Sequence, residues 1–95
     1  MQKIVINTTY GGFDLSDIGY KYYADLAGIL LDPNFSVDSI SRDDINLVQT
    51  VEHLGEKASS YFSRLKVVEI PDNISWSIKE YDGREWVAEK HLTWE

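Results

Sequence analysis

The sequence predicts a small α+β domain of two layers, with two helices on one face of a mixed sheet of about four strands in the order β-α-α-β-β-β. Two short runs rich in Ile and Val, residues 3–7 and 65–70, enclose two segments whose apolar residues recur at helical spacing. The pair Asp82-Gly83 then separates two strand-like runs and indicates a tight hairpin. Because 95 residues suffice for one core but not for two, we expect a single domain over residues 1–95.

The first strand is expected at residues 3–7, where three apolar residues in succession are typical of a strand covered on both faces. A loop with two adjacent glycines leads from it to a helix that Ser16 caps. Gly28 is expected near the end of this helix, before a turn at residues 32–34. The apolar residues of the helix recur on one side, which we expect to be its buried side: Leu15, Ile18, Tyr22, Leu26 and Ile29.

Residues 35–42 look irregular and are expected to form a loop. Ser41 is then predicted to cap a second helix, which either ends at Gly55 or continues there for one more turn. Its buried stripe is predicted to be Leu47, Val48, Val51, Leu54 and Ala58. The second strand follows at residues 65–70, and because helices separate it from the first, we expect the two to pair in parallel through a right-handed crossover.

The predicted hairpin flanks Asp82-Gly83, with strands at residues 75–81 and 84–91. A turn of two residues would place Glu80 opposite Glu85, where like charges repel. We therefore expect a longer turn with a shifted register; in the alternative, the two carboxylates meet a cation or a basic partner.

The formal net charge of −7 argues against direct binding to nucleic acid, for which a basic patch is the usual footprint. The chain contains no cysteine, which excludes disulfides and thiolate sites and fits a reducing compartment. It shows neither a signal peptide nor an apolar segment that could span a bilayer, so we expect a cytoplasmic protein without membrane contact. A homo-oligomer remains possible.

The glycine loop is the main candidate for a ligand site, because backbone without a Cβ before a helix N-terminus can approach an anion. Neither nucleotide-binding glycine motif is present, and Asp14 and Asp17 would repel an anion. A tight turn therefore stands beside the ligand site as an equal interpretation. Since Trp76 and Trp86 lie on opposite sides of the predicted ladder, one should be partly exposed as an anchor. The candidate ligand-binding residues are Tyr10, Gly11, Gly12, Phe13, Arg42, Arg84 and Trp86.

The sequence contains no recognisable catalytic set, so we expect a non-enzymatic protein without a cofactor. His53 and His91 lie close to glutamates, but their spacing is not that of a zinc motif. We expect both histidines at the surface or its boundary and no metal site.

Three segments resemble a group of short phage and prophage accessory proteins: residues 3–16 with Tyr-Gly-Gly-Phe, residues 42–56, and residues 80–94 with Tyr-Asp-Gly. The resemblance covers nearly the whole chain. It implies a small protein made in the cytoplasm of an infected bacterial cell, where such proteins often act by binding and commonly blunt a host defence.

Three functions stay open at this point. The first is binding of a small nucleotide-like or phosphate-bearing ligand at the glycine loop, with an arginine as phosphate partner. The second is inhibition of a host protein by an acidic surface that mimics nucleic acid. Its contact residues would be Asp43, Asp44, Glu80, Asp82 and Glu85. The third is a structural or regulatory phage protein whose motifs only maintain the fold.

Overall fold

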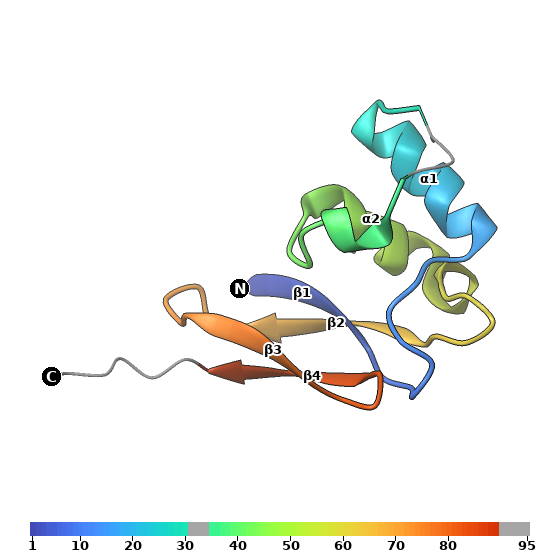
Figure 1. The fold of residues 1–95 in the computed structure, drawn as a ribbon. Helices are drawn as coiled ribbons and strands as arrows, with labels where there is room; N and C mark the ends of the chain where they lie inside the picture. Colours follow the sequence, from blue (N-terminus) through green and yellow to red (C-terminus); the bar gives the residue numbers. More distant parts are fainter. Residues whose placement is uncertain (31–34, 90–95) are drawn as a thin grey trace, which may run out of the picture.

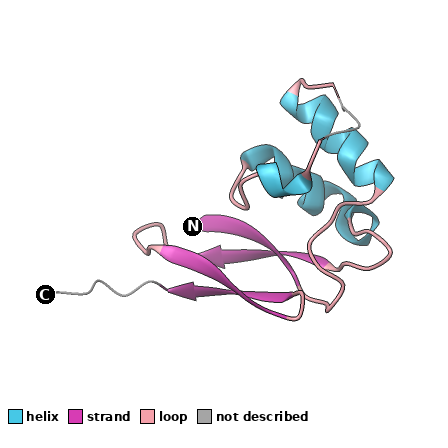
Figure 2. Cartoon of the chain, viewed as in Figure 1, coloured by secondary structure: helices cyan, strands magenta, loops and turns pink. Residues whose placement is uncertain are grey.

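The computed structural model describes residues 1–30 and 35–89, and it confirms a small α+β fold (Figure 1). The helices lie together on one side of the strands (Figure 2). In chain order the elements are β1 (Gln2–Asn7), α1 (Asp17–Ala27), the 3-10 turn η1 (Val37–Ser39), α2 (Ile45–Leu54), the 3-10 turn η2 (Gly55–Ala58), β2 (Leu65–Ile70), β3 (Trp76–Tyr81) and β4 (Arg84–Glu89).

The predicted parallel pairing of the first two strands is wrong, because β1 and β2 are antiparallel. The loop after η2 brings the chain back to the end of β1 rather than to its start, so that Leu65 pairs with Asn7. The Thr8 amide donates to the Arg64 carbonyl oxygen at 2.8 Å and extends the ladder by one pair. In place of one mixed sheet, the described strands form two antiparallel pairs, β1–β2 and β3–β4.

Helix α1 has the predicted ends, but its buried side differs from the prediction. Ser16 accepts a hydrogen bond from the Gly19 amide at 3.0 Å, and Gly28 ends the helix at a φ of 69°. The residues buried within the helix are Gly19, Tyr23 and Ala24, whereas Ile18 is 58% exposed. A Cβ on Gly19 would lie 3.0 Å from the Ala58 carbonyl oxygen, so small residues let α1 approach η2 closely. Close backbone approach, rather than the larger aliphatic side chains, decides which side faces inward.

Helix α2 begins after Asp44 and not after Ser41. The Asp44 carboxylate accepts hydrogen bonds from the amides of Asn46 at 2.8 Å and Leu47 at 3.2 Å, while the Ser41 hydroxyl donates to Asp43. A carboxylate three residues further along therefore takes the capping position. The predicted stripe is confirmed at Leu47, Val48, Val51 and Ala58, which are buried; Leu54 is half-buried.

The main core fills the space between the helices and one face of β1–β2. Val5 from β1 and Leu65 from β2 join it from below, and half-buried Val67 packs against it. Because side chains alternate along a strand, Ile6 and Lys66 point to the opposite face. The predicted loop at residues 35–42 contributes Val37 and Ile40 to this core through the short turn η1.

The hairpin has the two-residue turn, with Tyr81 opposite Arg84 and Glu80 opposite Glu85. Asp82 and Gly83 have φ values of 53° and 91°, as a type I′ turn requires. The expectation of a longer turn is therefore wrong. The second alternative is confirmed for Glu85 alone, whose carboxylate pairs with Arg42, whereas Glu80 accepts a hydrogen bond from the Gly83 amide.

A groove on the open face of the strands

The face of the strands that lies away from the helices carries a groove of about 560 Å³. We call it the strand-face groove. Strands β1 and β2, with the segment after β1, line it through Ile6, Thr8, Tyr10 and Lys66, and the hairpin lines it through Tyr81, Arg84, Glu85 and Trp86. Residues far apart in the sequence therefore form one concave surface.

Three aromatic side chains of the groove are open to solvent. Tyr10 is 62% exposed, Tyr81 is 72% exposed and Trp86 is 47% exposed. The ladder places Trp86 directly opposite Lys79, and Tyr81 directly opposite Arg84, on one face of the hairpin. Trp86 is thus the partly exposed tryptophan that the ladder predicted, while half-buried Trp76 donates from its indole to Gln2 at 3.1 Å.

Strand alternation places the basic and the acidic side chains of the hairpin on opposite faces. In the hairpin, Lys79 and Arg84 share the face of Trp86, whereas Glu80 and Glu89 lie on the other face. Within residues 1–30 and 35–89, none of the ion pairs involves Lys66, Lys79 or Arg84. The surface of the groove is therefore cationic although the chain as a whole is acidic.

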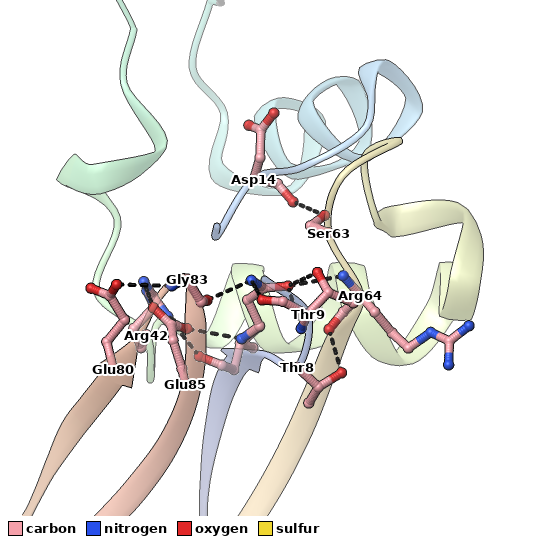
Figure 3. Close-up of polar contacts among 11 residues, drawn as sticks. Thr8, Thr9, Asp14, Arg42, Ser63, Arg64, Glu80, Gly83 and Glu85 are labelled. Atoms are coloured by element: carbon pink, nitrogen blue, oxygen red, sulfur yellow. Dashed lines mark hydrogen bonds and ion pairs between the residues drawn. The ribbon is translucent and has the colours of Figure 1, made fainter. Parts of the chain in front are cut away.

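Among residues 1–30 and 35–89, Glu85 is the one carboxylate in the groove lining, and Arg42 compensates its charge from the helix side. Its side chain is 8% exposed and accepts hydrogen bonds from the Arg42 guanidinium at 2.5 and 2.8 Å (Figure 3). The Asn7 amide, on the edge of β1 away from β2, donates to the same carboxylate at 2.8 Å. Arg42 also lies 3.6 Å above the ring of Phe13. This junction holds the hairpin against β1 and leaves little negative charge for a ligand to meet.

The glycine loop proves to be a packing element. A Cβ on Gly11 would lie 1.8 Å from the Phe62 carbonyl oxygen, and a Cβ on Gly83 would lie 2.5 Å from the Tyr10 carbonyl oxygen. Gly12 has a φ of +89°, which a residue with a side chain rarely adopts. These contacts dock the loop between the hairpin turn and the loop before β2. The geometry supports the tight-turn interpretation of both loop glycines.

The predicted ligand residues therefore divide into two groups. Tyr10, Arg84 and Trp86 come together in the strand-face groove. The other four serve the fold, as packing glycines, as the ring under a guanidinium, or as the partner of Glu85: Gly11, Gly12, Phe13 and Arg42.

The N-terminus of α1, which the sequence offered as an anion site, has partners within the chain. Ser16 caps it, and the Asp14 carboxylate beside it accepts a hydrogen bond from the Tyr20 hydroxyl at 2.5 Å. Burial and this carboxylate raise the pKa of Tyr20 well above its usual value near 10. The Asp14 carbonyl oxygen accepts from the Ser63 hydroxyl at 2.8 Å, which ties the helix start to the loop before β2 (Figure 3).

Most acidic residues of the inhibitor hypothesis have partners within the chain. Asp44 caps α2, and Glu85 is buried in its pair with Arg42. Asp43 accepts from the Ser41 hydroxyl, and Glu80 accepts from the Gly83 amide at 3.0 Å. Four of the five residues thus have partners inside the chain, and exposed Asp82 lies at the hairpin turn.

His53 stacks on Tyr22 with a ring-centroid distance of 4.8 Å. The described part of the chain contains no cluster of three or more His, Cys, Asp or Glu residues that could hold a metal ion. His91 and Trp94 lie outside the described residues, as does the turn predicted at residues 32–34. No helix within residues 1–30 and 35–89 is long and apolar enough to cross a membrane.

Sequence reasoning missed Thr8, Lys66 and Tyr81 as groove residues. The signal that could have found them is the antiparallel register, because it places Thr8 and Lys66 on the face opposite Val5. Tyr81 follows from the two-residue turn, which puts it beside Arg84.

No protein-family model matches this chain, and searches of curated proteins and of solved structures returned no significant match. The function of the chain is therefore inferred from the geometry of its own residues.

Proposed function

We propose that this protein is a non-enzymatic binding protein for a planar, phosphate-bearing ligand of the nucleotide type, which it holds in the strand-face groove. One observation carries the proposal. Exposed Tyr81 and Trp86 lie beside Lys66 and Arg84, and the only carboxylate among the described residues of the groove lining is compensated by Arg42.

The chemistry of the groove matches both halves of such a ligand. Ring faces of Trp and Tyr stack on planar bases, and this contact accepts any base because every base has a π face. Arginine and lysine bind phosphate oxygens through charge-assisted hydrogen bonds, and arginine can do so with two parallel bonds. Thr8 also lines the groove, and its hydroxyl donates to the Arg64 carbonyl oxygen at 3.0 Å. The ring would thus stack on the hairpin, with its phosphate toward Lys66 or Arg84.

The biological setting in this proposal comes from the resemblance to phage accessory proteins alone. In that setting the protein acts in the cytoplasm of an infected bacterial cell, and sequestering a nucleotide-type signal would blunt a host defence. The ligand chemistry of this role is inferred from the groove, and the cellular setting is inferred from the resemblance.

The binding test uses adenosine 5′-monophosphate, adenosine and ribose 5-phosphate as three probes in isothermal titration calorimetry at low salt. If ring and phosphate both contribute, adenosine monophosphate binds more tightly than either fragment. The variant Lys66→Glu/Arg84→Glu should lose this preference for the phosphate-bearing probe. Its matched control is Lys21→Glu/Lys57→Glu, which makes the same change in net charge on the exposed helix side of the chain.

Equal loss of binding in both double variants would show a general effect of net charge and would contradict a site in the groove. Absence of heat with all three probes at millimolar concentration, for a folded protein, would overturn the proposed function. Thermal unfolding followed by circular dichroism confirms that each variant is folded.

A further inference from the structure

We infer that the natural ligand of the strand-face groove is a segment of single-stranded nucleic acid, with its bases stacked on the exposed aromatics and its phosphates on the surrounding cations. The inference rests on the proposed function and names the form in which its ring and phosphate occur.

The first reason is that the groove is open. Pockets for small ligands usually bury most of the ligand surface. Here Tyr10 and Tyr81 are more than half exposed, and Trp86 is nearly so. Such rings can cover one face of a base and leave the rest of a bound nucleotide open to solvent. An open stacking surface suits a strand that crosses it and makes several moderate contacts in a row.

The second reason is that exposed aromatics continue beyond the groove. Tyr61 and Phe62 are 94% and 69% exposed, and their ring centroids are 5.0 Å apart. They adjoin the loop that carries Tyr10, because the Thr9 hydroxyl donates to the Phe62 carbonyl oxygen at 3.0 Å and Gly11 packs on the same carbonyl. The segment with these two exposed rings therefore lies next to the loop that carries Tyr10, where a strand that continues past the groove can meet it.

The third reason is that cations accompany the aromatics along this path. Lys66 of β2 pairs with Ile6 of β1, and both line the groove, where the Lys66 side chain is exposed. With Lys79 and Arg84 on the hairpin, three exposed cations of the described residues share the face of the exposed aromatic rings. Interleaved aromatic and basic side chains are the usual arrangement for binding a single strand without sequence preference.

The net charge of −7 argued against nucleic acid, but the structure separates the charges. Exposed carboxylates lie on both layers: Asp17, Asp25, Asp38, Asp43, Glu52 and Glu56 on the helix side, and Glu69, Asp72, Glu80, Asp82 and Glu89 on the strands and their turns. Within the described strands, alternation places Lys66, Lys79 and Arg84 on the groove face and Glu69, Glu80 and Glu89 on the opposite faces. Glu85 shares the face of Glu80 but reaches the groove lining, and Arg42 compensates its charge. Stacking on exposed aromatic rings needs bases whose faces are free, which a single strand offers and a paired duplex does not. The ligand is therefore expected to be unpaired.

The test measures fluorescence anisotropy of 5′-fluorescein-labelled oligothymidylates of 2, 4, 8 and 12 nucleotides, with the full chain and at several salt concentrations. Affinity should rise with length up to the number of nucleotides that cross the face and then level off. Since three cations are available, the slope of log K against log salt should be about −2, because each neutralised phosphate contributes about −0.7 in a single strand. A double-stranded hairpin of equal length should compete poorly.

Two variants locate the site. Trp86→Ala should weaken binding of the 12-nucleotide strand by about tenfold or more, since one base stack is lost. Tyr22→Ala, which removes an aromatic ring from the helix side, is its matched control and should leave the affinity unchanged. Lys66→Glu/Arg84→Glu should both weaken binding and flatten the salt slope, unlike Lys21→Glu/Lys57→Glu.

The outcomes of the nucleotide and oligonucleotide tests separate the proposed function from the single-strand inference. If adenosine monophosphate binds and the 12-nucleotide strand binds no more tightly, the inference fails and the proposed function stands. If neither binds to the folded protein, both fail. If the strand binds but the two control variants weaken it as much as the groove variants do, or if the duplex binds equally well, the single-strand surface assigned here is wrong.

Discussion

Replacing Glu85 with alanine tests the junction on which the groove depends. The Glu85 side chain is 8% exposed and accepts from both terminal nitrogens of Arg42 and from the Asn7 amide. The substitution leaves the Arg42 side chain, which is 19% exposed, without its counterion. It also leaves the Asn7 amide without an acceptor at the edge of β1.

The expected cost follows from these groups. Removing one partner of a buried ion pair typically costs about 3–5 kcal/mol, because the remaining charge is uncompensated. A buried amide without a partner adds about 1 kcal/mol or more, of which part overlaps with the first figure. Relative to a total stability of about 5–15 kcal/mol, Glu85→Ala should therefore lower the free energy of unfolding by about 4 kcal/mol.

Urea unfolding followed by tryptophan fluorescence and far-ultraviolet circular dichroism measures this change. Glu85→Gln is the milder companion, since its amide oxygen can still accept from Asn7, and it should cost clearly less. The double variant Arg42→Met/Glu85→Leu removes both charges and should be more stable than Glu85→Ala alone. A cost for Glu85→Ala below about 1 kcal/mol would refute the reasoning, because it is the value of an exposed pair.

Three further results are expected, one for the glycine loop and two for Tyr20. Gly11→Ala should lower the free energy of unfolding by about 3 kcal/mol or more, since its Cβ would meet the Phe62 carbonyl oxygen. Gly12→Ala should lower it by only about 1–2 kcal/mol, because the cost comes from the positive φ alone. Equal urea midpoints for the two variants would contradict this difference. Because the pKa of Tyr20 is raised in the fold, its contribution is present below about pH 10 and is lost as the pH rises above that value, so the melting temperature should fall there. Tyr20→Phe, which loses the bond to Asp14, should be less stable by about 1 kcal/mol at neutral pH and should show a flatter alkaline profile; an unchanged profile would count against this assignment.

The parts of the fold that the sequence predicted are those set by local chemistry. Ser16, Gly28 and the Asp82-Gly83 turn act through their immediate neighbours, and all three lie where their residue types indicate. The stripe of α2 was equally readable, because its polar and apolar sides are distinct.

The predictions were wrong where contacts between segments far apart in the sequence determine the structure. The buried side of α1 depends on how closely Gly19 approaches the carbonyl of Ala58, which helical spacing alone cannot show. The direction of β2 depends on where the loop after η2 returns. The sequence predicted a shifted hairpin register because it did not show the cation that compensates Glu85, which is Arg42, 43 residues earlier in the chain.

The candidate site was predicted in part for the same reason. Exposed Trp86 and its neighbour Arg84 could be read from the hairpin ladder alone. The glycine loop attracted attention as a ligand cradle, yet Gly11 and Gly12 have packing and conformational reasons that appear only in three dimensions. Lys66 joined the site through the antiparallel pairing that the sequence had not indicated.

The most direct test of the central claim is a ¹⁵N-resolved nuclear magnetic resonance titration of the full chain with adenosine monophosphate. The account predicts that the indole signal of Trp86 and the amide signals of Thr8, Lys66 and Arg84 shift together and saturate with one dissociation constant. Signals of the helix side, such as those of Lys21, should stay in place. Shifts confined to the helix side, or none at saturating nucleotide, would contradict a ligand site in the strand-face groove.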